Sequence, residues 1–303
     1  MSDLIHTPYS GKDYEFLFND PAGTLKDSAF EALRHKNVFR YRAKTIKSGN
    51  VVEIEIYPIW NTQNETRSAK ARTTRQAQEK VNDRNSKKAL TRIIDNNFGK
   101  DDHHITLTYR WDELPDEAQA LRDMQGFIKR VRYYHKKNGL LDAKGRPDLK
   151  YVYVIEFADG DGRRKRIHHH VIMNGRAPRK DVKSLWPHGR ASVDELEPEN
   201  GTLEGLARYI IKQPNQTKQT KRWQASRNLK PPKVTVSDTK LSKKQAERLA
   251  ADVKAAAPQI FSKLFRDYNL DVCTVKTSEF VAGAYIYAKM HKEQAEKRKG
   301  VGG

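Results

Sequence analysis

The chain has 303 residues, with 58 Lys and Arg against 38 Asp and Glu, and a formal net charge of +20 at pH 7 with histidine neutral. Domains average about 150 residues, so this length indicates about two domains. Positive charge in this excess indicates a polyanionic partner, of which nucleic acid is the commonest. A basic surface that serves only solubility is the alternative.

The sequence favours a cytoplasmic protein without membrane contact. Its single cysteine, Cys273, excludes an intramolecular disulfide and a cysteine-based zinc cluster. The first residues lack the basic start and apolar core of a secretory signal, and no apolar run approaches the roughly 20 residues of a membrane span. No GxxxxGK[ST] stretch occurs in the sequence, so the P-loop motor of a helicase is absent from it.

We treat residues 1–100 as an N-terminal hairpin followed by a basic helix. Alternating apolar and polar residues over 38–60, interrupted by Ser48-Gly49-Asn50, predict the hairpin. Residues 61–100 hold ten Lys or Arg and four Asp or Glu, and a helix is expected over about 74–96. Its apolar residues are too sparse for a core helix, so it lies on a phosphate backbone or is a solvated connector.

Residues 101–235 have the pattern of a compact α+β domain. The predicted elements are a strand at 104–109, a helix from Pro115 to Gly139, strands at 150–157 and 166–173, and a short helix at 201–214. The two later strands are joined by a loop dense in turn residues and therefore read as a hairpin.

We treat residues 236–303 as a C-terminal helical accessory segment. Ser242 caps a helix that runs to about Ala257, Pro258 starts a second helix, and 270–277 is a candidate last strand.

Three consecutive histidines carry the first chemical signal. Residues two apart in a strand point to the same face, so His168 and His170 project together while His169 points to the opposite face. Two imidazoles on one face suit neighbouring positions on one divalent ion, although a solvent-facing histidine pair has the same pattern. His103 and His104 are expected to be surface residues before the first strand, and His188 a loop histidine.

Glu156 shares the parity of the outer histidines. If the hairpin turns near Gly162, Glu156 lies opposite His168 on the same face. Two imidazoles and one carboxylate leave coordination positions open for water and phosphate, which suits Mg²⁺ or Mn²⁺. The alternative for Glu156 is an ion pair with Arg166 or a lysine.

Tyr209 and Lys212 lie one helical turn apart on the predicted short helix. A tyrosine phenol ionises near pH ~10, so it is a poor nucleophile until a cation or metal stabilises the phenolate. Lys212 would supply positive charge to the phenolate or to a phosphate. The alternative is an ordinary half-buried tyrosine beside a lysine.

Basic residues next to these motifs are candidate DNA contacts. The stretch 205–237 contains eight Lys or Arg and no carboxylate, with an aromatic residue available for base stacking. The alternatives are a mobile basic loop and a solvated hairpin tip. The candidate contacts are Arg163, Arg164, Lys165, Arg166, Lys218, Lys221, Arg222, Trp223 and Arg227.

The stretches ITLTY, YVYVIEF, RIHHHVIM and LARYIIKQP resemble, in order and spacing, the HUH-type rolling-circle replication initiators of phages, plasmids and mobile elements. That family has a hydrophobic strand with threonines, a His-hydrophobe-His strand and a helix carrying Tyr-x-x-Lys. The resemblance covers roughly residues 104–230. It departs at His169, which replaces the hydrophobe. A second tyrosine one turn away is also missing, because those positions hold Gly205 and Gln213.

The resemblance implies a central antiparallel sheet with flanking helices. It also implies a divalent metal on His168, His170 and Glu156, and cleavage of single-stranded DNA by Tyr209. The product would be a 5′-phosphotyrosine and a free 3′-OH.

The partners would be single-stranded DNA or a supercoiled duplex origin, together with a host helicase and polymerase. A relaxase, a tyrosine-dependent transposase and a non-catalytic nucleic-acid-binding protein on the same scaffold are the alternatives.

Overall fold

The computed structural model describes residues 38–60, 75–112, 114–158, 164–212, 222–277 and 282–292. The chain divides into two compact units, one formed by residues 1–82 and 232–303 and the other by residues 83–231. This division differs from the three consecutive segments expected from the sequence, because strands from both ends of the chain share one sheet. Each unit combines helices with an antiparallel sheet, so the α+β class is confirmed.

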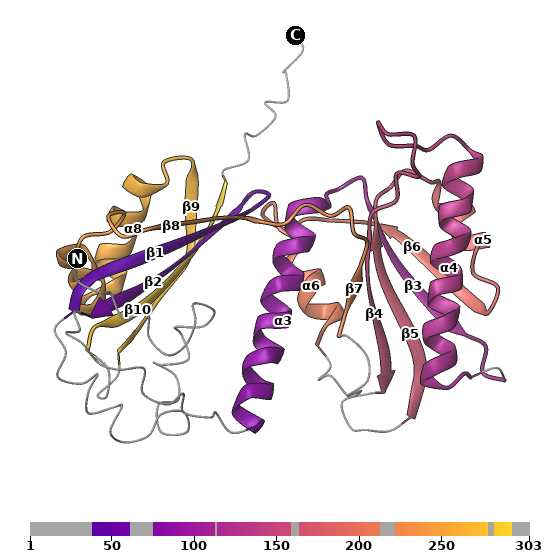
Figure 1. The fold of residues 1–303 in the computed structure, drawn as a ribbon, viewed down its shortest axis with the longest axis horizontal. Coiled ribbons are helices and arrows are strands. Elements are labelled where there is room, and N and C mark those ends of the chain that lie inside the picture. The colour runs from indigo at the N-terminus through magenta and orange to yellow at the C-terminus, as the bar shows by residue number, and fades with distance from the viewer. Residues whose placement is uncertain are drawn as a thin grey trace, which may run out of the picture. The chain divides into compact units, whose positions relative to one another are not determined.

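The first unit contains a five-stranded sheet in the order β8-β1-β2-β10-β9 (Figure 1). Its strands are β1 (Val38–Ser48), β2 (Val51–Trp60), β8 (Lys233–Ser237), β9 (Tyr268–Thr277) and β10 (Ala284–Lys292). Strands β1 and β2 form the predicted hairpin, with Ser48 paired to Val51 across a two-residue turn. Gly49 in that turn has a φ of 56°, a conformation that glycine adopts without a steric cost.

Two helices pack on one face of this sheet, α7 (Lys243–Ala251) and α8 (Val253–Leu264). Ser242 caps α7 as predicted, through a reciprocal capping box with Gln245. The predicted break at Pro258 is wrong, because Pro258 lies inside α8. The break falls at Asp252, whose side chain accepts a hydrogen bond from the backbone N–H of Ala255 and starts the second helix.

The second unit is built on a five-stranded sheet in the order β6-β3-β5-β4-β7, so β5 is its central strand. The strands are β3 (His103–Tyr109), β4 (Tyr151–Ala158), β5 (Arg164–Met173), β6 (Gly189–Glu195) and β7 (Gln224–Ala225). Strands β4 and β5 pair antiparallel, which confirms the hairpin expected from the two β-rich runs.

Helix α4 (Glu117–Lys137) covers one face of this sheet. Asp116 caps its first turn by accepting a hydrogen bond from the Gln119 N–H, and Gly139, with a φ of 68°, follows its end. The predicted apolar stripe is buried at Met124, Phe127 and their neighbours, each such side chain contributing about 1.5–3 kcal/mol.

Helices α3 (Arg75–Asn97) and α6 (Glu204–Ile210) pack on the opposite face (Figure 1). The expectation that α3 is too sparsely apolar for a core is wrong for its last turns, because Leu90 and Ile94 are fully buried. These residues are four apart and therefore lie on one side of the helix. A short helix, α5 (Arg179–Ser184), precedes β6.

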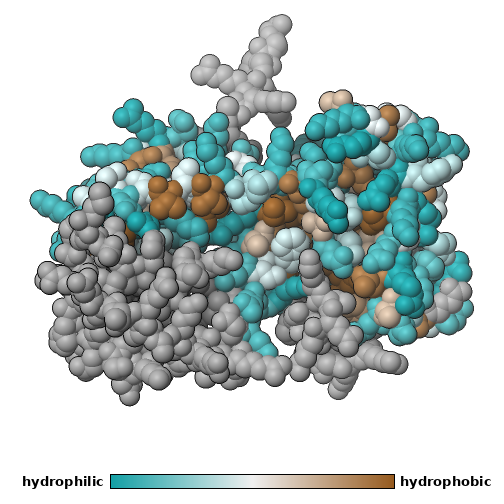
Figure 2. All heavy atoms as spheres, in the orientation of Figure 1, coloured by the Kyte–Doolittle hydropathy of each residue, from teal (hydrophilic) through white to brown (hydrophobic). Residues whose placement is uncertain are grey.

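Hydrophilic side chains dominate the described surface that Figure 2 shows, in keeping with the charge of the sequence. Within the described ranges, no helix has the length and apolar character needed to cross a membrane.

Candidate active site

The outer histidines occupy the central strand of the second unit. In the register of β4 and β5, Glu156 pairs with His168, as strand parity predicted. His168 and His170 stack with 6.4 Å between ring centroids and an interplanar angle of 21°. His169 is fully buried and belongs to the opposite face, where it contacts Trp186.

His170 is the most enclosed of the predicted metal ligands. Its side chain is buried, and its Nε2 lies 3.3 Å from Oε2 of Glu156. Burial lowers the pKa of His170, against the opposing effect of the Glu156 carboxylate. The ring is therefore neutral near pH 7, which is the form that binds metal ions. Its Nδ1 is buried without a hydrogen-bond partner.

Tyr209 and Lys212 lie beside this histidine. The Tyr209 ring meets the His170 ring edge-on, with 5.6 Å between centroids and an interplanar angle of 78°. Helix α6 ends at Ile210, earlier than predicted, and Lys212 follows it in the chain. The Nζ of Lys212 nevertheless lies 4.7 Å from the centroid of the Tyr209 ring. Tyr209 is 51% exposed, so a strand of nucleic acid has access to its phenol.

His104 belongs to this site and was not predicted. It lies on the site face of β3 and stacks on His170, with 5.7 Å between centroids and an interplanar angle of 15°. Burial and the neighbouring His170 lower the pKa of His104 to about 4. The expectation of two surface histidines is wrong for His103 as well, which is buried with its Nε2 3.0 Å from the carbonyl oxygen of Ala177.

The donor set on this face suits a hard or borderline divalent ion, because it offers neutral imidazoles and a carboxylate. In the described part of the chain, no group of three or more His, Cys, Asp or Glu side chains is gathered closely enough to hold a metal ion. The metal site on His168, His170 and Glu156 therefore stays a prediction.

The predicted DNA contacts have different surroundings. Arg227 is exposed. Arg222 is largely enclosed, forms an ion pair with Asp83 of α3 and donates a hydrogen bond to the carbonyl oxygen of Ile211 at 2.7 Å. Trp223 packs against the core beside α3, and its Nε1 donates to Oγ of Ser86 at 3.1 Å.

The remaining predicted contacts cannot be placed in the same way. Arg163, Lys218 and Lys221 lie outside the described residues, as do the side chains of Arg164, Lys165 and Arg166. Their DNA-binding role stays a prediction.

A cavity of about 370 Å³ lies beside His104, between the end of β6 and the start of α6. Its lining includes the carboxylates of Asp194, Glu195, Glu197 and Glu199. Negative charge of this density repels phosphate, so a nucleic-acid backbone would follow another path across the site face.

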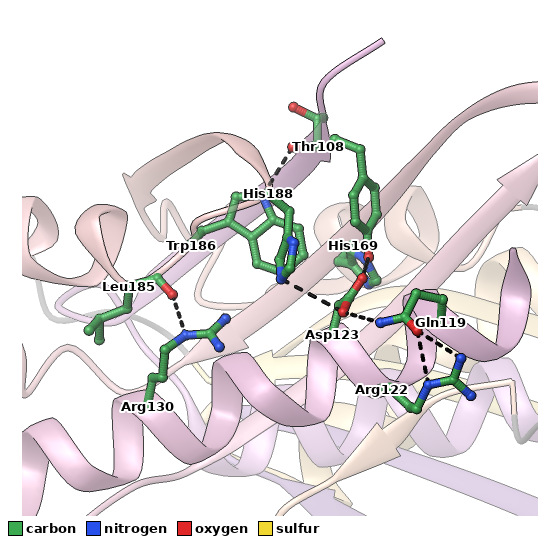
Figure 3. A network of polar contacts seen from close by, with 10 residues as sticks. Thr108, Gln119, Arg122, Asp123, Arg130, His169, Leu185, Trp186 and His188 are labelled. Carbon is green, nitrogen blue, oxygen red and sulfur yellow. Dashed lines mark hydrogen bonds and ion pairs between the residues drawn. The ribbon is translucent and has the colours of Figure 1, made fainter. Parts of the chain in front are cut away.

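On the α4 face, polar side chains form a second cluster (Figure 3). Tyr109 donates a hydrogen bond to Oδ2 of Asp123 at 3.1 Å, and its hydroxyl lies 2.9 Å from Nε2 of His169. Gln119 and His188 approach the other carboxylate oxygen of Asp123, at 2.7 and 3.7 Å. His188 precedes β6, as the loop position predicted for it requires.

The sequence model of one family, described as replication-associated protein ORF2, matches residues 102–216. The match supports a replication-initiator family for this segment, which contains the His170 and Tyr209 positions described above. No curated protein and no solved structure matches the chain.

Proposed function

We propose that this protein nicks and rejoins single-stranded DNA through a 5′-phosphotyrosine intermediate, and thereby initiates rolling-circle replication. The observation that carries the proposal is the contact between Tyr209 and His170, within the segment that matches a replication-associated family. An exposed phenol next to neutral imidazoles and a carboxylate combines a nucleophile with ligands for a phosphate-polarising ion.

In this proposal the phenolate oxygen of Tyr209 attacks the scissile phosphorus. A tyrosine–phosphate bond forms while the bond from phosphorus to the 3′-oxygen breaks. The phenol proton passes to solvent, and the departing 3′-oxygen gains a proton to become the 3′-OH. One phosphodiester replaces another, so rejoining requires no nucleotide.

The neighbouring side chains have defined parts in this scheme. Lys212, with its ammonium near the Tyr209 ring, would stabilise the phenolate or the phosphate charge. His168, His170 and Glu156 would hold Mg²⁺ or Mn²⁺, which when bound withdraws charge from the scissile phosphate. Single-stranded DNA or a supercoiled duplex origin would be the substrate, with a host helicase and polymerase acting on the product.

The proposal is tested by incubating the protein with end-labelled single-stranded DNA and Mn²⁺ and separating the products on a denaturing gel. A labelled protein band that withstands denaturation and disappears in Tyr209→Phe supports the proposal. Binding of the DNA without such a band would favour a non-catalytic nucleic-acid-binding protein.

A further inference from the structure

His169 replaces the hydrophobic residue that the resemblance leads one to expect, and it has polar partners that a hydrophobic residue would leave unsatisfied. Its ring is fully buried on the α4 face of the sheet. Because the Asp123 carboxylate only accepts, the Tyr109 hydroxyl proton points to Asp123. The phenol oxygen then accepts from the Nε2–H of His169, at 2.9 Å.

The acceptor at the end of this chain is itself fixed. Asp123 lies on the buried side of α4, and Gln119, one turn earlier, donates to its Oδ1 at 2.7 Å. Figure 3 shows Asp123 between Gln119 and His188. The hydrogen bonds therefore run from α4 to β3 and from β3 to the central strand β5.

This chain acts on the strand that presents the site histidines. Successive side chains of a strand point to opposite faces, so a rotation of β5 about its axis moves His169 and its two neighbours together, in opposite directions. Ile167, Val171 and Met173 also face α4 from β5, but their apolar contacts have no preferred direction. A hydrogen bond has both a preferred length and a preferred angle.

We propose that Tyr109, His169 and Asp123 are positioning residues that fix the rotation of β5 and thereby the placement of His168 and His170 on the site face. The catalytic consequence rests on the proposed function, whereas the placement of the two rings does not.

The test compares Tyr109→Phe with Val171→Ala, a change on the same face of β5 that removes only apolar contact. Single-turnover formation of the protein–DNA adduct is measured below the unfolding temperature of every variant. Tyr109→Phe is expected to slow adduct formation by about tenfold or more, as loss of a supporting hydrogen bond does at other sites, while the DNA Kd stays within about twofold. Val171→Ala should destabilise the protein without a comparable loss of rate.

The double variant Tyr109→Phe/His169→Leu separates positioning from stability. Replacing both hydrogen-bond partners with apolar groups relieves the cost of a buried unsatisfied atom, so the melting temperature should recover relative to Tyr109→Phe. The rate should stay low. Recovery of the rate together with stability, or an equal loss of rate in Val171→Ala, would overturn the proposal.

Imidazole NMR signals of His168 and His170 provide a readout that does not depend on cleavage. We expect them to move or broaden in Tyr109→Phe more than in Val171→Ala. If the wild-type protein forms no adduct, the proposed nicking is lost, and these spectra decide the positioning claim. Signals that are no more disturbed in Tyr109→Phe than in Val171→Ala would refute it.

Discussion

The ring of Tyr209 meets the ring of His170 edge-on at 5.6 Å between centroids, although the two residues come from different elements. The burial of neighbouring side chains explains the contact. Ala207 and Ile210 of α6 pack into the same apolar cluster as Val154 and Ile172, which flank His170 on the site face of the sheet. This packing leaves the exposed side of α6 with its tyrosine over the histidine.

Tyr209→Phe should abolish the covalent adduct and leave folding and DNA binding intact. The side chain is half exposed, so the change in unfolding free energy is expected to stay within about 0.5 kcal/mol. Tyr133→Phe is the matched control, because Tyr133 is also an exposed helix tyrosine in the same unit. Loss of the adduct in Tyr133→Phe, or its persistence in Tyr209→Phe, would assign the nucleophile elsewhere.

His168→Ala and His170→Ala should each lose nicking and most Mn²⁺ affinity, measured by titration calorimetry. Glu156→Gln should resemble them, because a neutral amide is a poorer ligand for a hard cation than a carboxylate. His169→Ala should mainly lower stability, by about 1–3 kcal/mol, since it leaves the Tyr109 hydroxyl without its donor. An equal loss of Mn²⁺ affinity in all three histidine variants would contradict the opposed faces of the strand.

Arg227→Gln should weaken single-strand binding and flatten its salt dependence. Removing one phosphate contact to a single strand lowers the slope of log K against log salt by about 0.7 in magnitude. Arg222→Gln is the informative comparison, because its guanidinium is engaged with Asp83 and the Ile211 carbonyl. It should lower the melting temperature and leave the slope unchanged. A flatter slope in Arg222→Gln alone would mean that this arginine binds the phosphate.

Trp223→Ala should lower stability, because the indole packs into the core and donates to Ser86. If a base also stacks on the indole, single-strand binding weakens by a further ~1–3 kcal/mol with little change in salt slope. Fluorescence titration of folded protein, below the melting temperature of the variant, measures the change in binding free energy. Unchanged affinity would exclude the stacking role predicted for this residue.

Stability should fall as the pH drops below about 6.5, the ordinary pKa of histidine. Burial lowers the pKa of His169 to about 3, with the neighbouring histidines adding to the shift. The unfolded chain therefore binds a proton that the folded chain excludes, which costs up to about 1.4 kcal/mol per pH unit between these two pKa values. In His169→Leu, the fall in unfolding free energy between pH 6.5 and 4.5, measured by urea denaturation, should be shallower. An identical pH slope would mean that His169 is not kept neutral by the fold.

Local pattern carried much of the site. Strand alternation placed His168 and His170 on one face, and the hairpin register placed Glu156 opposite His168. Long-range pairing carried the rest and is not written in any one segment. His104 reaches His170 only because β3 pairs with β5. Arg222 stands in a stretch without carboxylates, yet its partner Asp83 comes from a helix that lies far away in the sequence.

The buried side of α3 was missed for a related reason. Its sequence is rich in charge, and the two fully buried residues form a single stripe near its end. Amphipathic periodicity needs several turns to stand out, so a helix that packs through its last turns gives a weak signal.

The most direct test of the central claim is to locate the DNA attachment by tandem mass spectrometry. Protein incubated with single-stranded DNA and Mn²⁺ is digested with nuclease and protease, and the peptide carrying a nucleotide is sequenced. We predict a nucleotide joined through its 5′-phosphate to Tyr209 and a free 3′-OH on the released strand. Attachment to another residue, or cleaved DNA with no attached nucleotide on any peptide, would contradict the claim.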